Sequence, residues 1–318
     1  MTIPKALAKI LLQLYHSAYL ARHGQSCLYV NGALHVNTHN LSFSEHNFGD
    51  DVTLPLVEAL TGLKAIPYKF TFGTPTQDVF LIIGSIIEDY SLPNAVIWGA
   101  GLIDTPKQTI TPPRKICAVR GPLTRAELLK QGMTCPEVYG DPAILLPAIY
   151  QPAVPKKYRL GIIPHVMDKK LPVLRQLSMH LPPASTTLID MEKYGHWQLL
   201  LDKLCECETI ISSSLHGVIL ADAFHIPNRW VEFSDQVIGS GFKFRDYYAG
   251  SGRAITTPLR IRDTQSLPDL NNAVRSWQRP QFDFAALMAA CPLPLRHDLK
   301  LDFHSDQDRV RTCTSTVF

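Results

Sequence analysis

Short apolar runs alternate with helical patterns along most of this chain, and this alternation limits the fold more than any other feature. In the first half, runs with the length of buried strands lie at 27–32, 79–87, 95–103 and 115–121, and helical patterns lie at 51–62 and 122–132. Such alternation predicts a parallel sheet with crossover helices. The helix Pro122–Lys130 is the best marked, because proline stands at its start and Gly132 just beyond its end.

A proline-rich, basic segment at 151–158 separates this series from a second one. After it, strands are expected at 159–165, 186–191, 209–214 and 229–233, and helices at 168–180, 196–207 and 215–225. A chain of 318 residues is long enough for two domains. We therefore predict two Rossmann-like α/β domains, residues 1–152 and 159–259. Residues 260–318 are expected to add helices at 270–278 and 282–292 that cross back over the first domain, followed by a polar tail.

Charge and cysteine content exclude several classes of protein. The net charge is only +3, and no basic stripe interleaved with aromatic residues is present, so a nucleic-acid partner is not expected. The seven cysteines are scattered and odd in number, which suits a reducing compartment and predicts a cytoplasmic protein. Cys205 and Cys207 form a C-x-C pair, but the helical pattern around them favours a helix over a metal site. No metal and no cofactor is expected.

The segment 5–24 is apolar on a helical period, but Lys5, Lys9, His16 and Arg22 interrupt it, and it lacks a signal-type cleavage site. It is therefore expected to be neither a signal peptide nor a membrane span. A helix packed on its own domain is the favoured interpretation. The alternative is a basic amphipathic helix that rests on an anionic membrane surface.

The stretch Ile210–Trp230 carries the clearest sign of a ligand site. A buried strand ends in Ser213 and Ser214 and enters a helix at Leu215, so free backbone N–H groups at the helix start would form an anion site. His216 lies in the first helical turn, where a bound anion would favour its protonated form and let it act as a general acid. Gly217 would allow close backbone approach. The structural alternative is a satisfied core histidine.

Two further cations follow element ends in the two halves of the chain. Ligands of doubly wound sheets collect beyond the carboxyl ends of the strands, so Arg120 and His216 are expected to face one cleft. Arg120 offers a bidentate fork for carboxylate or phosphate, and Lys243, after the glycine-rich 239–241 loop, offers a mobile charge. A salt-bridged arginine and an ordinary surface loop are the structural alternatives. His165, at the mouth of a strand, is a weaker candidate for phosphate contact.

The loop Asn47–Asp51 opens a helix, with Asp50 or Asp51 as the natural N-cap. The other carboxylate would then be available to accept a proton from a sugar hydroxyl. His46 and Asn47 are additional polar candidates. Asp141, which precedes Pro142, is interpreted as a structural residue that caps or turns the chain.

Nine segments, taken in order, resemble the polysaccharide pyruvyl transferase family. Any one of them is a weak sign, but their joint order and spacing are specific, and together they span Asn47 to Tyr248. They are NFGDD (47–51), GS (84–85), WGAG (98–101), AVRGPLT (118–124), GDPAILLP (140–147), IIPH (162–165), SSSLHG (212–217), AFHIPNRW (223–230) and FKFRDYY (242–248).

The resemblance implies a fold similar to GT-B glycosyltransferases, with a C-terminal segment that returns to the first domain. It implies phosphoenolpyruvate as the donor and two hydroxyls of a hexose in a bacterial surface polysaccharide, or its lipid-linked precursor, as the acceptor. The product would be a cyclic pyruvate ketal, with release of phosphate. By motif, Arg120 and Lys243 would contact the donor and the Ser214–Leu215–His216 segment would hold its phosphate, with His216 as the acid; Ser213, Gly217 and His165 complete the expected donor site. The acceptor would lie against His46, Asn47, Asp50 and Asp51.

Two other classes of function stay open. A nucleotide-sugar glycosyltransferase would use the same fold, and fold alone does not separate the two. Three cationic groups without a base-stacking residue or a ribose-binding carboxylate favour a small dianion over a nucleotide. A non-catalytic glycan-binding or assembly subunit is the third class. If the acceptor is lipid-linked, the basic N-terminal helix becomes a candidate for peripheral contact with the cytoplasmic membrane.

Overall fold

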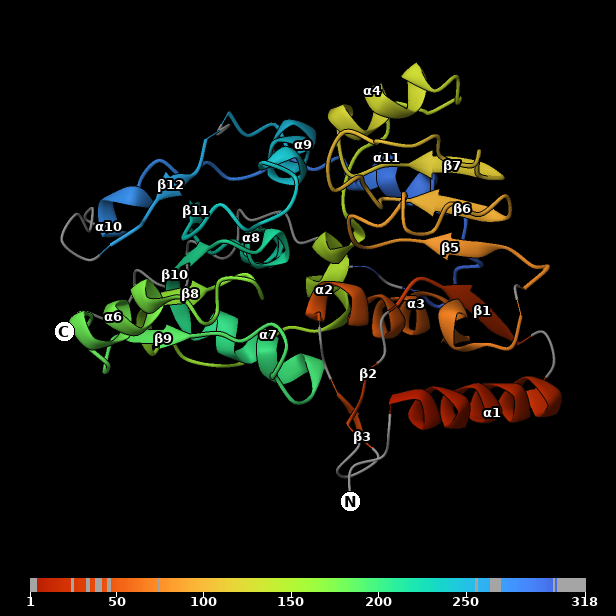
Figure 1. Cartoon of the computed structure of the whole chain (residues 1–318), viewed down its shortest axis with the longest axis horizontal. Helices are drawn as coiled ribbons and strands as arrows, with labels where there is room; N and C mark the ends of the chain where they lie inside the picture. Colours follow the sequence, from red (N-terminus) through yellow and green to blue (C-terminus); the bar gives the residue numbers. More distant parts are fainter. Residues whose placement is uncertain are drawn as a thin grey trace.

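The chain folds around two five-stranded parallel sheets, which confirms the predicted α/β class (Figure 1). The structure is a computed structural model and describes residues 5–23, 26–32, 35–37, 42–44, 47–73, 75–254, 257–263, 270–299 and 301. Within these ranges, no helix has both the length and the hydropathy that a bilayer span requires.

The first sheet has the strand order β4-β1-β5-β6-β7. Its strands are β1 (Cys27–Val30), β4 (Lys64–Pro67), β5 (Val79–Leu81), β6 (Ala95–Trp98) and β7 (Lys115–Ala118). They are short and apolar, and β5 and β6 are buried throughout, as expected for strands covered on both faces. Helices of this half are α1 (Lys5–His23), α2 (Phe48–Asp51), α3 (Thr53–Thr61) and α4 (Pro122–Lys130), with a 3-10 turn η1 (Tyr68–Phe70) and a hairpin of β2 (His35–Asn37) and β3 (Ser42–Ser44).

The second sheet has the order β12-β11-β10-β8-β9. Its strands are β8 (Tyr158–Ile163), β9 (Thr186–Leu188), β10 (Cys207–Ser212), β11 (Asn228–Glu232) and β12 (Leu259–Arg260). Its helices are α6 (Pro172–His180), α7 (Trp197–Cys205), α8 (Leu215–Ala223), α9 (Phe242–Gly250) and α10 (Leu270–Ala273). Every residue of α8 is buried, in agreement with a sequence that is apolar apart from His216 and Asp222.

Several boundaries differ from the sequence prediction; for example, the strand expected at 79–87 ends at Leu81 and the helix expected at 168–180 begins at Pro172. Cys207 lies in β10 and not in the preceding helix, because its backbone pairs with Tyr158 of β8 in a parallel ladder. The helix expected at 270–278 is shorter, since α10 ends at Ala273.

Several contacts join the two halves. The segment after β7 forms η2 (Pro142–Leu145) and α5 (Leu146–Ile149), and η2 packs against α8. The C-terminal helix α11 (Phe284–Ala289) lies against the first sheet, where the Trp98 indole N–H donates to the Leu287 carbonyl at 2.9 Å. Arg120, just after β7, is paired with Asp246 of α9. These contacts hold the carboxyl ends of several strands around one cavity.

Candidate functional site

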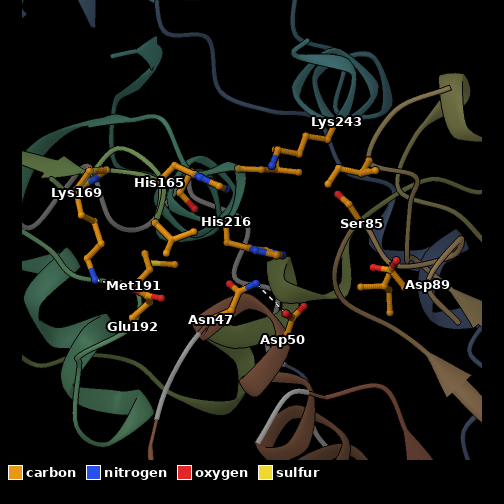
Figure 2. Close-up of a pocket in the computed structure, with 16 residues that line it drawn as sticks. Asn47, Asp50, Ser85, Asp89, His165, Lys169, Met191, Glu192, His216 and Lys243 are labelled. Atoms are coloured by element: carbon orange, nitrogen blue, oxygen red, sulfur yellow. Dashed lines mark hydrogen bonds and ion pairs between the residues drawn. The ribbon is translucent and has the colours of Figure 1, made fainter. Parts of the chain in front are cut away.

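A cavity of about 230 Å³ lies between the two halves of the molecule (Figure 2). Side chains from both halves line it, so neither half forms the site alone. From the first half it is lined by Asn47, Asp50, Ser85, Ile86, Asp89 and Ile103, and from the second half by Pro164, His165, Val166, Lys169, Met191, Glu192, Ser214, Leu215, His216 and Lys243.

The start of α8 forms one wall of the cavity, as the sequence predicts. Ser214 is the N-cap in extended conformation, and its side chain makes no capping bond. The first N–H groups of a helix have no intrahelical acceptor, so Leu215 and His216 present theirs at this wall. Ser213 does not line the cavity: its hydroxyl donates to Asp168 at 2.6 Å and accepts from the His165 backbone N–H at 2.8 Å. Ser213 therefore positions His165.

Gly217 has a packing role in the same turn. A Cβ at this position would lie 2.4 Å from the Ser212 hydroxyl and 2.9 Å from Ile163. Only glycine lets the first turn of α8 approach the ends of β8 and β10 this closely.

His216 is nearly buried and faces two different groups. On the Nδ1 side, the ring packs over Gly49, where a Cβ would lie 1.8 Å from Nδ1. On the other side, Nε2 lies 3.9 Å from an Asp141 carboxylate oxygen, a separation too long for a hydrogen bond. Both of these atoms are buried and have no hydrogen-bond partner among the described residues. Such groups are rare in native structures and point to a functional role or a missing ligand.

Burial keeps His216 neutral and shifts the ionisation of Asp141 to near neutral pH. Burial, with help from the charges of Lys243 and Arg120, lowers the pKa of His216 to about 3. Burial raises the pKa of Asp141 to about 7, against the hydrogen bond from the Ala143 N–H. The structure confirms that Asp141 caps a turn, since that N–H begins η2. It adds a contact with His216 that the sequence interpretation missed.

His165 presents a hydrogen-bond donor to the cavity. Its Nδ1 accepts from the Met167 N–H at 3.3 Å. Burial and the charge of Lys243 lower its pKa to about 4, so the ring is neutral. A neutral ring whose Nδ1 accepts a hydrogen bond carries its proton on Nε2.

Lys243 enters the cavity from the first turn of α9 (Figure 2). Unlike Arg120 and Lys169, it forms no ion pair with the described residues. Its side chain is mostly buried, and burial together with the charge of Arg120 lowers its pKa to about 8, while Asp50 acts in the opposite direction. The ammonium group is therefore charged at neutral pH and is held in an environment that favours an incoming anion.

Asp50 lies on the side of the cavity formed by the first half. Burial raises its pKa to about 6, and the Asn47 amide donates to it at 2.7 Å. The N-cap prediction was wrong, because α2 begins at Phe48 and Asn47 is its cap, which leaves both aspartates inside the helix. Asp51 does not line the cavity and accepts from the Tyr194 hydroxyl at 2.7 Å. His46 lies outside the described residues.

Arg120 is fully buried and does not line the cavity. Its guanidinium donates to Asp246 at 3.0 Å, to the Leu102 carbonyl at 2.6 Å and to the Ser85 hydroxyl at 2.5 Å. Ser85 does line the cavity. Arg120 therefore affects the cavity through the Ser85 hydroxyl and through the positive charge of the guanidinium. This geometry differs from the direct donor contact that the resemblance implies.

Several cavity residues were not identified from the sequence as chemical groups. Asp89, Lys169 and Glu192 lie in loops without a motif that marks them, whereas Ser85 belongs to the GS segment (84–85) of the resemblance but was given no role. Lys169 is held by Asp190 and Glu192, the latter at 2.7 Å, which fixes it at the far edge of the cavity. The rule that parallel strands collect ligands beyond their carboxyl ends was the one signal available for them.

The arrangement separates two chemical environments. One wall offers helix N–H groups, two histidines and a charged lysine, which suit a small anion. The opposite wall offers a carboxylate whose pKa lies near neutrality, which suits removal of a proton from a hydroxyl group. A transfer from an anionic donor to a hydroxyl acceptor fits this pairing.

Comparison with known proteins agrees with this reading. The chain is 27% identical over 246 residues to the succinoglycan biosynthesis protein ExoV of Rhizobium meliloti (strain 1021), with 74% of this chain and 71% of that protein covered. It is 32% identical over 177 residues to the uncharacterized protein L143 of Acanthamoeba polyphaga mimivirus, with 54% and 60% covered. The polysaccharide pyruvyl transferase family model matches residues 5–235. This chain therefore belongs to the polysaccharide pyruvyl transferase family.

Proposed function

We propose that this protein transfers the pyruvyl group of phosphoenolpyruvate to two hydroxyls of a hexose, as part of bacterial surface polysaccharide biosynthesis. The product is a cyclic pyruvate ketal, and phosphate is released. One observation carries the proposal: the N-terminus of α8, His165, His216 and Lys243 converge on one small cavity that Asp50 faces from the other half. The two parallel sheets around this cavity support a GT-B-like arrangement.

The proposed donor and its position rest on the charge and the size of the cavity. The phosphate would lie at the start of α8, against the N–H groups of Leu215 and His216, with Lys243 and the Nε2–H of His165 as further donors. The cavity of about 230 Å³ is smaller than the roughly 300–1,000 Å³ typical of drug-sized ligands. A small dianion fits such a space better than a nucleotide sugar does.

His216 would deliver the first proton. The positive charges of Lys243 and Arg120 help to keep the His216 ring neutral. When the negative charge of a bound donor offsets them, the ring becomes a better base and takes up a proton. Protonation of the donor's methylene carbon gives an oxocarbenium-like centre. Asp141, whose pKa lies near 7, supports this step because its carboxyl group returns a proton to Nε2 of His216.

The acceptor would supply both new bonds. The first sugar hydroxyl attacks the oxocarbenium-like carbon and loses its proton to Asp50, and phosphate then leaves with its bond electrons. The second hydroxyl attacks the same carbon, passes its proton to the departing phosphate and closes the ketal. Lys243, and Arg120 through Ser85, offset the negative charge of the carboxylate and the phosphate throughout.

Phosphate release from phosphoenolpyruvate tests the proposal directly. The purified protein is incubated with a panel of galactosides, glucosides and mannosides, and the product mass is recorded. Acceptor-dependent release with the mass gain of a pyruvate ketal is the expected result. If a nucleoside diphosphate raises the melting temperature and phosphoenolpyruvate does not, a nucleotide-sugar glycosyltransferase replaces the proposal. Glycan binding without stabilisation by either donor identifies a non-catalytic subunit.

Donor affinity is expected to fall as the pH rises through about 8. Lys243 is charged below its pKa of about 8 and loses its charge above it, so the attraction to the donor dianion is present at low pH and lost at high pH. Loss of one charged hydrogen bond weakens binding by about tenfold or more. Calorimetric titration with phosphoenolpyruvate measures the change. Lys243→Met is the control and should bind weakly with no such fall; an unchanged fall in this variant would assign the pH dependence to another group.

Replacement of Gly49 by alanine is expected to reduce turnover by about 100-fold, the scale of a 1 Å displacement of a catalytic group. The new methyl group would lie 1.8 Å from His216 Nδ1, and the ring stands on a buried helix, so the ring or α2 must shift. Gly32→Ala is the matched control, because its nearest neighbours lie at 3.6 Å, an ordinary contact distance. Equal turnover in the two variants would show that His216 tolerates the displacement.

A further inference from the structure

Among the described side chains of the N-terminal helix α1 (Lys5–His23), those that pack on the first half lie on one face. Leu12 and His16 are its buried residues, each 4% exposed. His16 Nδ1 lies 2.9 Å from the Phe70 carbonyl, and the Gln13 amide donates to the Thr71 carbonyl at 3.1 Å. These contacts fix which side of the helix faces the protein.

The opposite side of α1 is an exposed apolar stripe. It consists of Leu7, Ile10, Leu11, Leu14 and Tyr15, which are 43% to 54% exposed. Their spacing of i, i+3, i+4, i+7 and i+8 is the pattern that normally turns a helix towards a core. In this protein the stripe points away from the core. A contiguous apolar patch of this kind marks a binding surface.

The charges around the stripe are of one sign. The first acidic residue of the chain is Glu45, and the 44 residues before it contain Lys5, Lys9 and Arg22. Lys9 and Arg22 are exposed on α1 itself. Because α1 carries no acidic side chain, a second copy of the same face would offer Arg22 no opposite charge. An anionic surface with an apolar interior complements both properties, and a bilayer with anionic headgroups is such a surface.

We propose that α1 lies in the headgroup plane of an anionic membrane, with the stripe of Leu7, Ile10, Leu11, Leu14 and Tyr15 buried among the acyl chains. Arg22, seven residues after Tyr15 and therefore on the same side of the helix, then meets the lipid phosphates. The helix is not long and apolar enough to cross the bilayer. It binds reversibly, by apolar burial and electrostatic attraction together.

Docking by α1 would bring the cavity near the membrane. The helix contacts β2 and belongs to the half of the molecule that supplies Asn47 and Asp50 to the cavity. A hexose carried on a membrane lipid would then reach Asp50 from the bilayer surface. This consequence rests on the proposed function, whereas the membrane binding itself does not.

Vesicle flotation with the full chain tests the proposal. The vesicles contain phosphatidylglycerol and phosphatidylcholine in equal amounts, or phosphatidylcholine alone. The wild-type protein is expected to float with the anionic vesicles, and the double variant Leu11→Glu/Leu14→Glu to bind them at least about tenfold more weakly. Added salt should weaken wild-type binding, because it screens the attraction to the headgroups.

A matched control carries the same charge change elsewhere. Met179 on α6 and Leu199 on α7 are 71% and 56% exposed, so Met179→Glu/Leu199→Glu should float as the wild type does. Equal flotation of the two double variants, or no flotation of the wild type, would overturn the proposal. A wild-type dimer without vesicles that only the stripe variant dissociates would assign the face to a second copy instead. Phosphate release with a water-soluble acceptor should be equal in all three proteins. This assay does not depend on vesicles, so it separates a failure of the proposed function from a failure of membrane binding.

Discussion

Replacement of His216 by alanine is expected to lower turnover with phosphoenolpyruvate by at least about 100-fold, the lower scale for loss of a general acid. The ring stands at the start of α8, over Gly49 and opposite Asp141, and no other described histidine except His165 lines the cavity. His165 is held by the Met167 N–H at its Nδ1, so it is not positioned to take over the proton transfer through that atom. Acceptor-dependent phosphate release measures the loss.

The control for this variant is His180→Ala, an exposed histidine on α6 whose loss should leave turnover unchanged. Stabilisation of His216→Ala by phosphoenolpyruvate shows that the variant is folded and still binds the donor through Lys243 and the helix start. Near-wild-type turnover in a folded His216→Ala protein would exclude the proposed acid. A turnover loss of similar size in Asp141→Asn would support the role of Asp141 in resupplying the proton.

Replacement of Asp246 by alanine is expected to lower the free energy of unfolding by about 3–5 kcal/mol, the usual cost of leaving one member of a buried ion pair alone. Asp246 and Arg120 are both fully buried. The carboxylate also accepts from the Thr124 N–H at 2.9 Å and from the Thr124 hydroxyl at 2.7 Å, so it ties α9 to the start of α4. Its removal leaves the Arg120 charge and two Thr124 donors without their acceptor. Urea denaturation measures the change.

Two comparisons separate this effect from a general loss of charge. Asp298 forms an exposed pair with Arg296, and Asp298→Ala should leave the denaturation midpoint unchanged. The double variant Arg120→Met/Asp246→Leu removes the whole pair and should recover much of the stability, because an apolar replacement needs no compensating charge. If Asp246→Ala and Asp298→Ala have equal midpoints, the buried pair does not hold the two halves together.

Much of the architecture was readable from local patterns. The helix Pro122–Lys130 was predicted with its exact bounds, because proline at N1 and a glycine after the last turn are signals of neighbouring residues alone. Both series of strands and the start of α8 at Leu215 followed from apolar periodicity in the same way. The boundary at Cys207 was missed, because pairing with β8 decides it, and β8 lies about fifty residues earlier in the chain.

The cavity residues show which features of the site local sequence does not predict. Sequence reasoning named His165, His216, Lys243, Asn47 and Asp50, and the structure brings all five to one cavity. Arg120 was named because its guanidinium group can bind a carboxylate or phosphate with two hydrogen bonds. Whether that group is available to a ligand depends on Asp246, a residue 126 positions away. Asp141 was assigned to its turn, which local sequence does determine, and its position opposite His216 depends on the packing of η2 against α8.

The sequence by itself therefore determined the element types, the family and the chemical character of the groups at the strand ends, because each of these depends on neighbouring residues or on motif order. The tertiary structure alone decided which groups are charged, which are paired and which face the cavity. Burial shifts the pKa values of His216, Asp141 and Lys243, and burial is a property of contacts between distant segments. The outward direction of the α1 stripe has the same origin, since the contacts of Gln13 and His16 with the segment at Phe70 fix the rotation of that helix.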